Sequence, residues 1–186
     1  MIFVFEGLPG SGKTTISKIL EKEEGFFRVG EMLDDEGKEL CPSDVGGFSQ
    51  TFFLKSDKIK LDCAMNYKNN NIIIDRSPLS TIAYNLCLNK KFEETKLMEN
   101  LKLLLKKYSD NSMYFYIKIS PKLSIQRKKK KPNAKDLWSL NKHLVKTEKI
   151  YDKYLIDKKN VLIINGKEKI SEVYNRIKSE ILKQNI

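Results

Sequence analysis

The feature that most limits the fold of this chain is a glycine-rich loop with the spacing G-x-x-x-x-G-K-T, at residues 7–14. Residues 2–6 before it form an apolar run short enough for a buried strand, and residues 13–23 after it carry apolar side chains at helical spacing. A glycine loop between a strand and a helix lets backbone N–H groups surround phosphate oxygens at the positive end of the helix dipole. The sequence therefore predicts a site for a nucleoside triphosphate, with ATP as the expected cofactor.

The loop residues have separate expected roles in that site. The ammonium of Lys13 would reach the terminal phosphates, and the hydroxyl of Thr14 would bind Mg²⁺, the second expected cofactor. The predicted ATP-binding residues are Gly7, Leu8, Pro9, Gly10, Ser11, Gly12, Lys13, Thr14 and Thr15.

Length and composition favour one domain over residues 1–186, with 40% hydrophobic and 32% charged residues. No apolar stretch is long enough to span a membrane, and the first residues read as a strand rather than a signal peptide. The three widely spaced cysteines have no metal-binding pattern, which is typical of reduced thiols in the cytoplasm. The net charge of +11 comes mostly from lysines spread along the chain, so we do not expect nucleic acid as a partner.

Strands and helices are expected to alternate along the chain. Expected strands are 2–6, 25–30, 72–74, 113–119 and 161–164; expected helices are 13–23, 48–67, 79–88, 92–108, 136–156, 168–183 and one that starts near 121. This order predicts an α/β, three-layer P-loop NTPase fold, with a five-stranded parallel sheet and helices on both faces. The segment of about 121–137 is expected to close as a lid.

Ligands on such sheets bind at the carboxyl ends of the strands. Asp75 and Arg76 follow the β-branched run 72–74, so a carboxylate and a guanidinium are expected there. Asp75 would hold Mg²⁺ next to Thr14, and Arg76 would clamp the phosphate or sugar end of an acceptor. Asn165 and Gly166 would let the backbone approach the adenine of ATP.

Two motifs carry a resemblance to known kinases. The segment Phe5-Glu6-Gly7 before the loop, and Asp75-Arg76-x-x-x-Ser80-x-x-Ala83-Tyr84-Asn85 after the third strand, resemble the thymidylate kinase family. The segment 50–54 is similar to the neighbouring deoxynucleoside kinases, in which a glutamine reads the base. Residues 116–121 followed by Arg127 are similar to the fourth strand and the lid entry of both families.

The resemblance implies ATP-dependent phosphoryl transfer to a nucleotide or nucleoside, with roles for several further residues. Gln50 would read the base, with Phe48 or Tyr84 against it, and Arg127 would reach the transferred phosphoryl group. Glu31 resembles the carboxylate with which deoxynucleoside kinases accept the proton of the attacking hydroxyl. The candidate catalytic residues are Lys13, Glu31, Arg76 and Arg127; the candidate acceptor-binding residues are Glu31, Gln50, Arg76 and Tyr84.

Several alternatives stay open at this point. The spacing from Asp75 to Asn85 favours a nucleoside monophosphate as the acceptor, with Arg28 as a further cation for its phosphate, while Glu31 favours a nucleoside. A kinase acting on a nucleic-acid end or another small molecule is a further alternative, as is a hydrolase or switch. The segment 141–144 resembles a guanine-binding motif but lacks its aspartate, which argues against a GTPase. The oligomeric state is open, and a homodimer is one of the arrangements considered.

Overall fold

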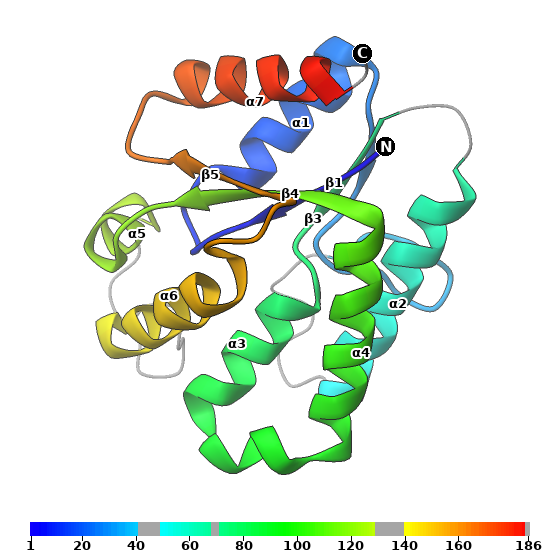
Figure 1. Ribbon diagram of the computed structural model, residues 1–186, viewed down its shortest axis with the longest axis vertical. Coiled ribbons are helices and arrows are strands. Elements are labelled where there is room, and N and C mark those ends of the chain that lie inside the picture. Colours follow the sequence, from blue (N-terminus) through cyan, green and yellow to red (C-terminus); the bar gives the residue numbers. More distant parts are fainter. Residues whose placement is uncertain (41–48, 68–70, 129–139, 185–186) are drawn as a thin grey trace.

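A parallel five-stranded sheet forms the centre of the computed structural model, which describes residues 1–40, 49–67, 71–128 and 140–184 (Figure 1). The strand order is β2-β3-β1-β4-β5, so β1 lies between two strands that follow it in the chain. The strands are β1 (Ile2–Glu6), β2 (Phe27–Val29), β3 (Ile72–Asp75), β4 (Ser112–Lys118) and β5 (Val161–Asn165). The predicted α/β class and parallel sheet are confirmed.

Helices cover both faces of this sheet, as predicted. Figure 1 shows α1 (Lys13–Glu24) and α7 (Ile170–Gln184) above the sheet. The helices below it are α2 (Gln50–Asn66), α3 (Pro78–Leu88), α4 (Lys96–Asn111) and α6 (Asn141–Leu155). The short helix α5 (Pro121–Lys128) lies beyond the end of β4, on the side to which the strand arrowheads point.

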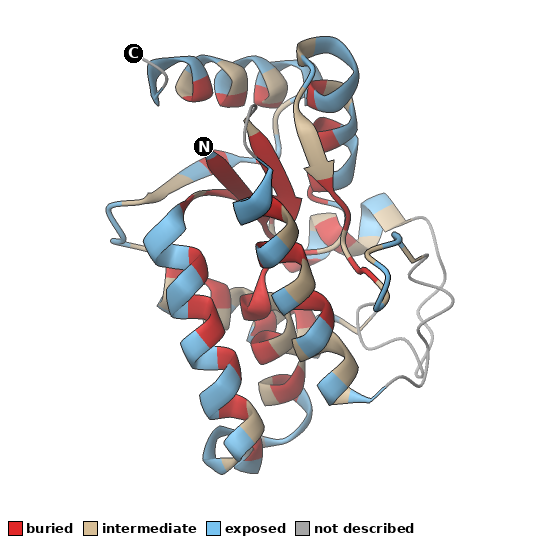
Figure 2. Cartoon of the chain, turned by 90° about the vertical axis from the view of Figure 1, so that its right-hand side faces the viewer, coloured by how far each residue is buried: buried red, intermediate tan, exposed pale blue. Residues whose placement is uncertain are grey.

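The alternation of side chains along the strands separates two apolar cores. In β1, Phe3 and Phe5 pack toward α1 and α7, whereas Ile2 and Val4 pack into the larger core beneath the opposite face. Every residue of β1 and β3 is buried, and Figure 2 shows this buried band between the helical layers. The continuous apolar strands of the sequence are thus explained by a sheet covered on both faces.

Several predicted boundaries differ from the structure by a few residues, and two of these differences have a cause in local backbone chemistry. The strand expected at 25–30 is shorter, since Gly25 adopts a left-handed φ of 68° and ends α1. The helix expected at 92–108 is preceded by a 3₁₀ turn, η1 (Lys90–Glu94). The hydroxyl of Thr95 then accepts a hydrogen bond from the Met98 N–H at 3.2 Å, so α4 begins only at Lys96.

Parts of the expected lid and of the expected helix 136–156 lie outside the described residues. The structure describes α5 at the start of the lid and resumes at Leu140, one residue before α6. Among the described helices, none combines the length and the apolar character needed to cross a bilayer.

Candidate active site

The carboxyl ends of β1 and β3 and the segment after β2 meet at one edge of the sheet. Phe5 pairs with Asp75 across β1 and β3, and Val29 pairs with Ile74 across β2 and β3. This register brings Glu6, Glu31 and Arg76 to the same edge, from parts of the chain far apart in sequence. The edge is where ligands of parallel sheets bind, so we describe it as the candidate active site.

Three glycines of the loop at residues 7–12, Gly7, Gly10 and Gly12, have a positive φ that other residues rarely adopt. Gly7 has a φ of 144°, and a Cβ at this position would clash with the carbonyl oxygen of Ile117 on β4. Gly12 has a φ of 101° and caps α1, where its carbonyl accepts the Ile16 N–H at 2.9 Å. The loop therefore leads directly into the N-terminus of α1, the geometry expected of an anion site.

Lys13 lies folded over this loop. Its ammonium donates to the carbonyls of Gly7 (2.8 Å) and Leu8 (3.1 Å) and to the hydroxyl of Ser11 (3.3 Å). Burial, together with the positive charge of Arg76, lowers the pKa of Lys13 to about 8. All three acceptors are neutral oxygens, so an anionic phosphate would be a stronger partner for the same ammonium.

Thr14 and Asp75 form the part of the site that fits a divalent cation. The Thr14 hydroxyl donates to Oδ2 of Asp75 at 2.6 Å, and Asp75 is fully buried. Among the described residues, Oδ1 of Asp75 has no hydrogen-bond partner. A buried carboxylate oxygen is costly to leave unpaired, and carboxylate and hydroxyl oxygens are ligands that Mg²⁺ accepts. These two residues would hold Mg²⁺, although their role stays a prediction.

Arg76 is the centre of the other half of the site. Its Nε donates to Glu31 Oε1 at 2.6 Å, and its Nη1 lies 3.2 Å from the Gly7 carbonyl, 3.1 Å from the Ser80 hydroxyl and 3.2 Å from the Tyr151 hydroxyl. The guanidinium is thus shared between the phosphate loop and Glu31. Its backbone has a φ of 67°, in the left-handed region that a residue other than glycine rarely adopts.

The ion pair shifts the pKa values of both partners. For Glu31, burial acts to raise the pKa, but the positive charges of Arg76, Lys13 and Lys60 outweigh it and the pKa is lowered. For Arg76, burial acts to lower the pKa, but the charge of Glu31 and other acidic groups raises it above its usual value. Both side chains are therefore charged at neutral pH.

Glu6 and Tyr151 belong to this network and were not among the predicted site residues. Glu6 is fully buried and accepts the Ser77 N–H (2.8 Å) and the hydroxyls of Ser77 (2.7 Å) and Ser80 (2.9 Å). Burial raises its pKa, against the lowering effect of the Arg76 charge and the Ser77 hydrogen bonds. The motif Phe5-Glu6-Gly7 is a sequence signal for Glu6, whereas Tyr151 sits in an ordinary amphipathic helix and gives none.

The predicted base-reading residues come from α2 and α3. Gln50, half-buried at the start of α2, accepts a hydrogen bond through Oε1 from the Asn85 amide at 2.7 Å. Tyr84 precedes Asn85 on α3 and is also half-buried. Phe48 lies outside the described residues. This hydrogen bond joins Gln50, from the segment similar to deoxynucleoside kinases, to Asn85, from the motif similar to thymidylate kinases. The role of these residues in base recognition stays a prediction.

Arg127 contacts the phosphate loop, whereas Asn165 lies at the end of β5, two strands away from β1. Arg127 on α5 is exposed, and its Nη1 donates to the Gly10 carbonyl at 3.3 Å. The Ser124 hydroxyl donates to the Pro9 carbonyl at 2.6 Å, so α5 is attached to the loop. Asn165, at the end of β5, is exposed and donates to Glu168 at 3.0 Å.

Arg28 was expected to face phosphate and lies elsewhere. It is on β2, where it forms ion pairs with Glu21 on α1 and with Glu39. Its register partner is Ile73, which packs into the core beneath α1 and α7. Side chains alternate along a strand, so Arg28 shares the α1 face of the sheet and its charge is taken up by carboxylates there.

Comparison with known proteins gives relatives along nearly the whole chain. No protein-family profile matches the sequence. A probable thymidylate kinase of Picrophilus torridus is 28% identical, over 98% of this chain and 94% of its own. A probable thymidylate kinase of Methanocaldococcus jannaschii is 27% identical, over 95% and 93% respectively. A thymidylate kinase of Buchnera aphidicola is also 27% identical, over 96% and 93%.

Solved structures of one enzyme share the fold. The deoxyadenosine kinase of M. mycoides with bound dATP matches with a TM-score of 0.67 and 18% identity, over 97% of this chain and 99% of that chain. The same enzyme with bound dCTP matches with a TM-score of 0.65 and 17% identity, over 98% and 100%. The sequence relatives and these structures support a P-loop enzyme of the nucleotide and nucleoside kinase type, which resembles thymidylate kinases in sequence and a deoxynucleoside kinase in fold.

Proposed function

We propose that this chain transfers the γ-phosphoryl group of ATP to a nucleoside monophosphate, with Mg²⁺, in the manner of a thymidylate kinase. The observation that carries the proposal is the position of Arg76, whose guanidinium reaches both Gly7 in the phosphate loop and Glu31 beside it. A cation at that point would bring an acceptor phosphate next to the phosphates of ATP. The thymidylate kinase names of the sequence relatives support thymidine monophosphate as the first acceptor to test. A cytoplasmic enzyme and a homodimer are parts of the same proposal.

The residues around the loop match what phosphoryl transfer requires. The negative charge of two phosphate chains must be neutralised, the donor and acceptor must be held in line, and water must be excluded. Lys13 and Arg127 flank the loop and would supply positive charge to the donor. Mg²⁺, when bound by Thr14 and Asp75, would neutralise charge on the β- and γ-phosphates. Arg76 would orient the acceptor.

The lowered pKa of Glu31 argues against a reaction that depends mainly on a general base. A general base works best when its pKa is near the working pH. The pKa of Glu31 is lowered, because Arg76, Lys13 and Lys60 outweigh the effect of burial. A monophosphate carries its own anionic oxygen and requires no such base. We therefore assign Glu31 the role of orienting Arg76 through the 2.6 Å ion pair.

A deoxynucleoside kinase is the second candidate. The fold neighbours are structures of a deoxyadenosine kinase, and Gln50 and Asn85 are paired at the start of α2 and within α3. In this alternative Glu31 would accept the proton of the attacking hydroxyl. Because the phosphate loop is shared, both candidates use ATP in the same way; they differ in the acceptor and in the role of Glu31.

A panel of acceptors distinguishes the candidates. The protein is incubated with ATP and Mg²⁺ and with each common nucleoside or nucleoside monophosphate, and both ADP and the phosphorylated product are quantified. We expect a nucleoside diphosphate product from at least one monophosphate, and far less of it from the Lys13→Ala variant. Product from nucleosides alone would establish the second candidate. ADP formation without an acceptor would indicate a hydrolase, and labelling of an oligonucleotide would indicate a nucleic-acid kinase.

A further inference from the structure

A buried lysine lies directly beneath the candidate site. Lys60 on α2 is 1% exposed, and its ammonium forms an ion pair with Asp57 at 2.7 Å. The same ammonium donates to the carbonyl of Glu31 at 3.0 Å and to that of Arg76 at 3.1 Å, with the Asp75 carbonyl at 3.5 Å. The three carbonyls belong to residues whose side chains form the metal and acceptor parts of the site.

Lys60 contacts the backbone just beyond the carboxyl ends of β2 and β3, where the pairing of these strands stops. The pairing of β2 with β3 stops at Val29 and Ile74, so no strand hydrogen bonds join the backbone at residue 31 to that at residue 76. The ammonium of Lys60 bridges those two segments instead. A lysine ammonium offers three donors, which the Asp57 carboxylate and the carbonyls of Glu31 and Arg76 can take up.

One of the residues that Lys60 contacts, Arg76, has a strained backbone conformation. Arg76 has a φ of 67°, and such a conformation persists only where the surroundings fix it. Its N–H donates to the Phe5 carbonyl at 3.0 Å, and its own carbonyl accepts from Lys60. Both backbone groups of Arg76 are therefore held, one by β1 and the other by Lys60.

We propose that Lys60 is a positioning residue, which fixes the backbone of Arg76 and Glu31 so that their side chains meet in the geometry that transfer needs. The catalytic part of this inference rests on the proposed function. Among the described residues, the ammonium of Lys60 has polar contacts with the carboxylate of Asp57 and with backbone carbonyls, and none with a side chain assigned to the transfer. A purely structural role is the alternative: Lys60 would then only neutralise Asp57.

The test combines a spectroscopic and a kinetic readout on Lys60→Met. The chain has four arginines, so ¹⁵N-arginine labelling gives few Nε–H signals, and Arg76→Lys identifies the one from Arg76. We expect this signal to move or broaden in Lys60→Met, because its hydrogen bond to Glu31 is lost. We also expect kcat to fall on the order of 10²-fold, the cost of a small misplacement in an active site, with an unchanged KM for ATP.

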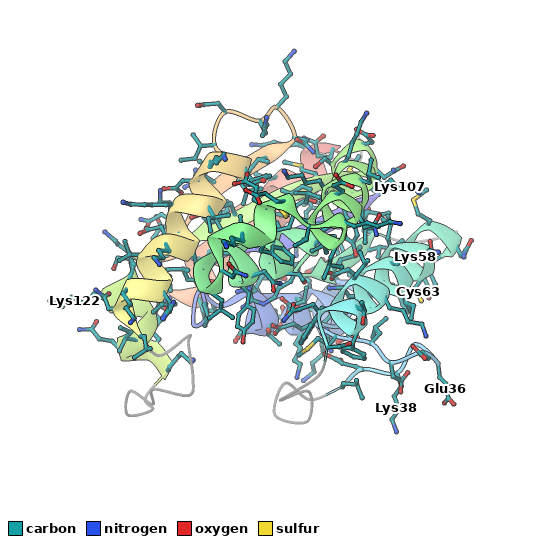
Figure 3. All side chains as sticks on the ribbon, turned by 90° about the horizontal axis from the view of Figure 1, so that it is seen from below. Glu36, Lys38, Lys58, Cys63, Lys107 and Lys122 are labelled. Atoms are coloured by element: carbon teal, nitrogen blue, oxygen red, sulfur yellow. The ribbon has the colours of Figure 1, made fainter. Side chains whose placement is uncertain are left out.

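Two further variants separate positioning from folding. Lys58→Met is the matched control, since Lys58 is exposed on the same helix, where Figure 3 labels it; we expect it to behave like the wild type. Lys60→Met leaves the buried carboxylate of Asp57 without its cation, and the double variant Asp57→Asn/Lys60→Met removes that charge as well. The double variant can therefore be measured even if Lys60→Met alone does not fold. It should fold but keep the altered Arg76 signal and the low kcat.

These measurements distinguish a positioning role of Lys60 from a purely structural one. An unchanged Arg76 signal in the folded variant, or wild-type transfer in the double variant, would overturn the positioning role and leave only charge neutralisation. The spectroscopic readout needs no acceptor. If the wild type transfers phosphate to no nucleoside or monophosphate, the proposed function fails, while the Arg76 signal still decides the role of Lys60 in the structure.

Discussion

The two halves of the candidate site are built in different ways. The donor half comes from one continuous stretch, residues 7–14, whose glycines and helix N-terminus define the binding geometry locally. The acceptor half is assembled from Glu31 after β2, Gln50 on α2, Arg76 after β3 and Tyr151 on α6. Its geometry therefore depends on how the whole larger core packs. We infer that the donor half tolerates distant changes, whereas substitutions in α2 or α6 disturb the acceptor half.

The largest expected effect is in the donor half. Lys13→Ala should reduce transfer by about 10³-fold, because it removes a cation aimed at the phosphates. Steady-state ADP formation measures the loss, and circular dichroism checks that the fold is kept. Lys18→Ala, on an exposed position of the same helix, is the control and should be fully active. Normal turnover of ATP by Lys13→Ala would show that the loop assignment is wrong.

The next largest effect is expected at Asp75, which lies where the donor half of the site meets the acceptor half. Asp75→Asn removes the charge of a buried carboxylate that lies 2.6 Å from Thr14. We expect a loss on the order of 10²-fold at limiting Mg²⁺, partly restored as the Mg²⁺ concentration rises. A titration of activity against Mg²⁺ measures this. If the loss is the same at every concentration, the assignment of Asp75 to the metal is contradicted.

A smaller effect is expected from Arg76→Lys, which changes only the acceptor half. Lysine keeps the charge but cannot contact Glu31, Gly7 and Ser80 together through one planar group. We expect kcat/KM for the acceptor to fall by roughly 10- to 100-fold, with ATP affinity nearly unchanged. Separate titrations of ATP and acceptor test the difference. Unchanged kinetics would reduce Arg76 to a structural ion pair.

The pH dependence of ATP binding tests the donor half alone. Because burial lowers the pKa of Lys13 to about 8, the free protein loses this charge above that pH. Bound phosphates favour the charged form, so binding above pH 8 must take up a proton, and affinity should fall by up to about tenfold per pH unit. Calorimetry at pH 9 in two buffers of different ionisation enthalpy measures the uptake. Lys13→Arg stays charged and should show none.

The division into a donor half and an acceptor half also explains which parts of the fold and the site could be predicted from the sequence. The phosphate loop, the parallel sheet and the pairing of Thr14 with Asp75 follow from local patterns, and the structure contains all three. The position of Arg28 was predicted wrongly, because the sequence does not say which face of β2 it takes.

Tertiary contacts were the hardest to foresee. Tyr151 and Lys60 lie within the helices α6 and α2, and their sequence pattern is that of ordinary helical residues. Only the packing of α2 and α6 against the strand ends brings them to Arg76. Family motifs therefore pointed to Glu31, Gln50 and Arg76, whose role in binding the acceptor stays a prediction, but they gave no sign of the supporting contacts.

The smallest expected effect gives the most direct test of a monophosphate acceptor. Glu31→Gln keeps an oxygen that can accept the Arg76 Nε–H but removes the carboxylate charge that a general base needs. Transfer to thymidine monophosphate, or to the best monophosphate of the panel, is compared for the wild type, Glu31→Gln and Glu31→Ala. We expect Glu31→Gln to stay within about tenfold of the wild type, and Glu31→Ala to lose more because Arg76 is no longer oriented. A near-total loss in Glu31→Gln, with ATP binding retained, would contradict this account and make the acceptor a nucleoside.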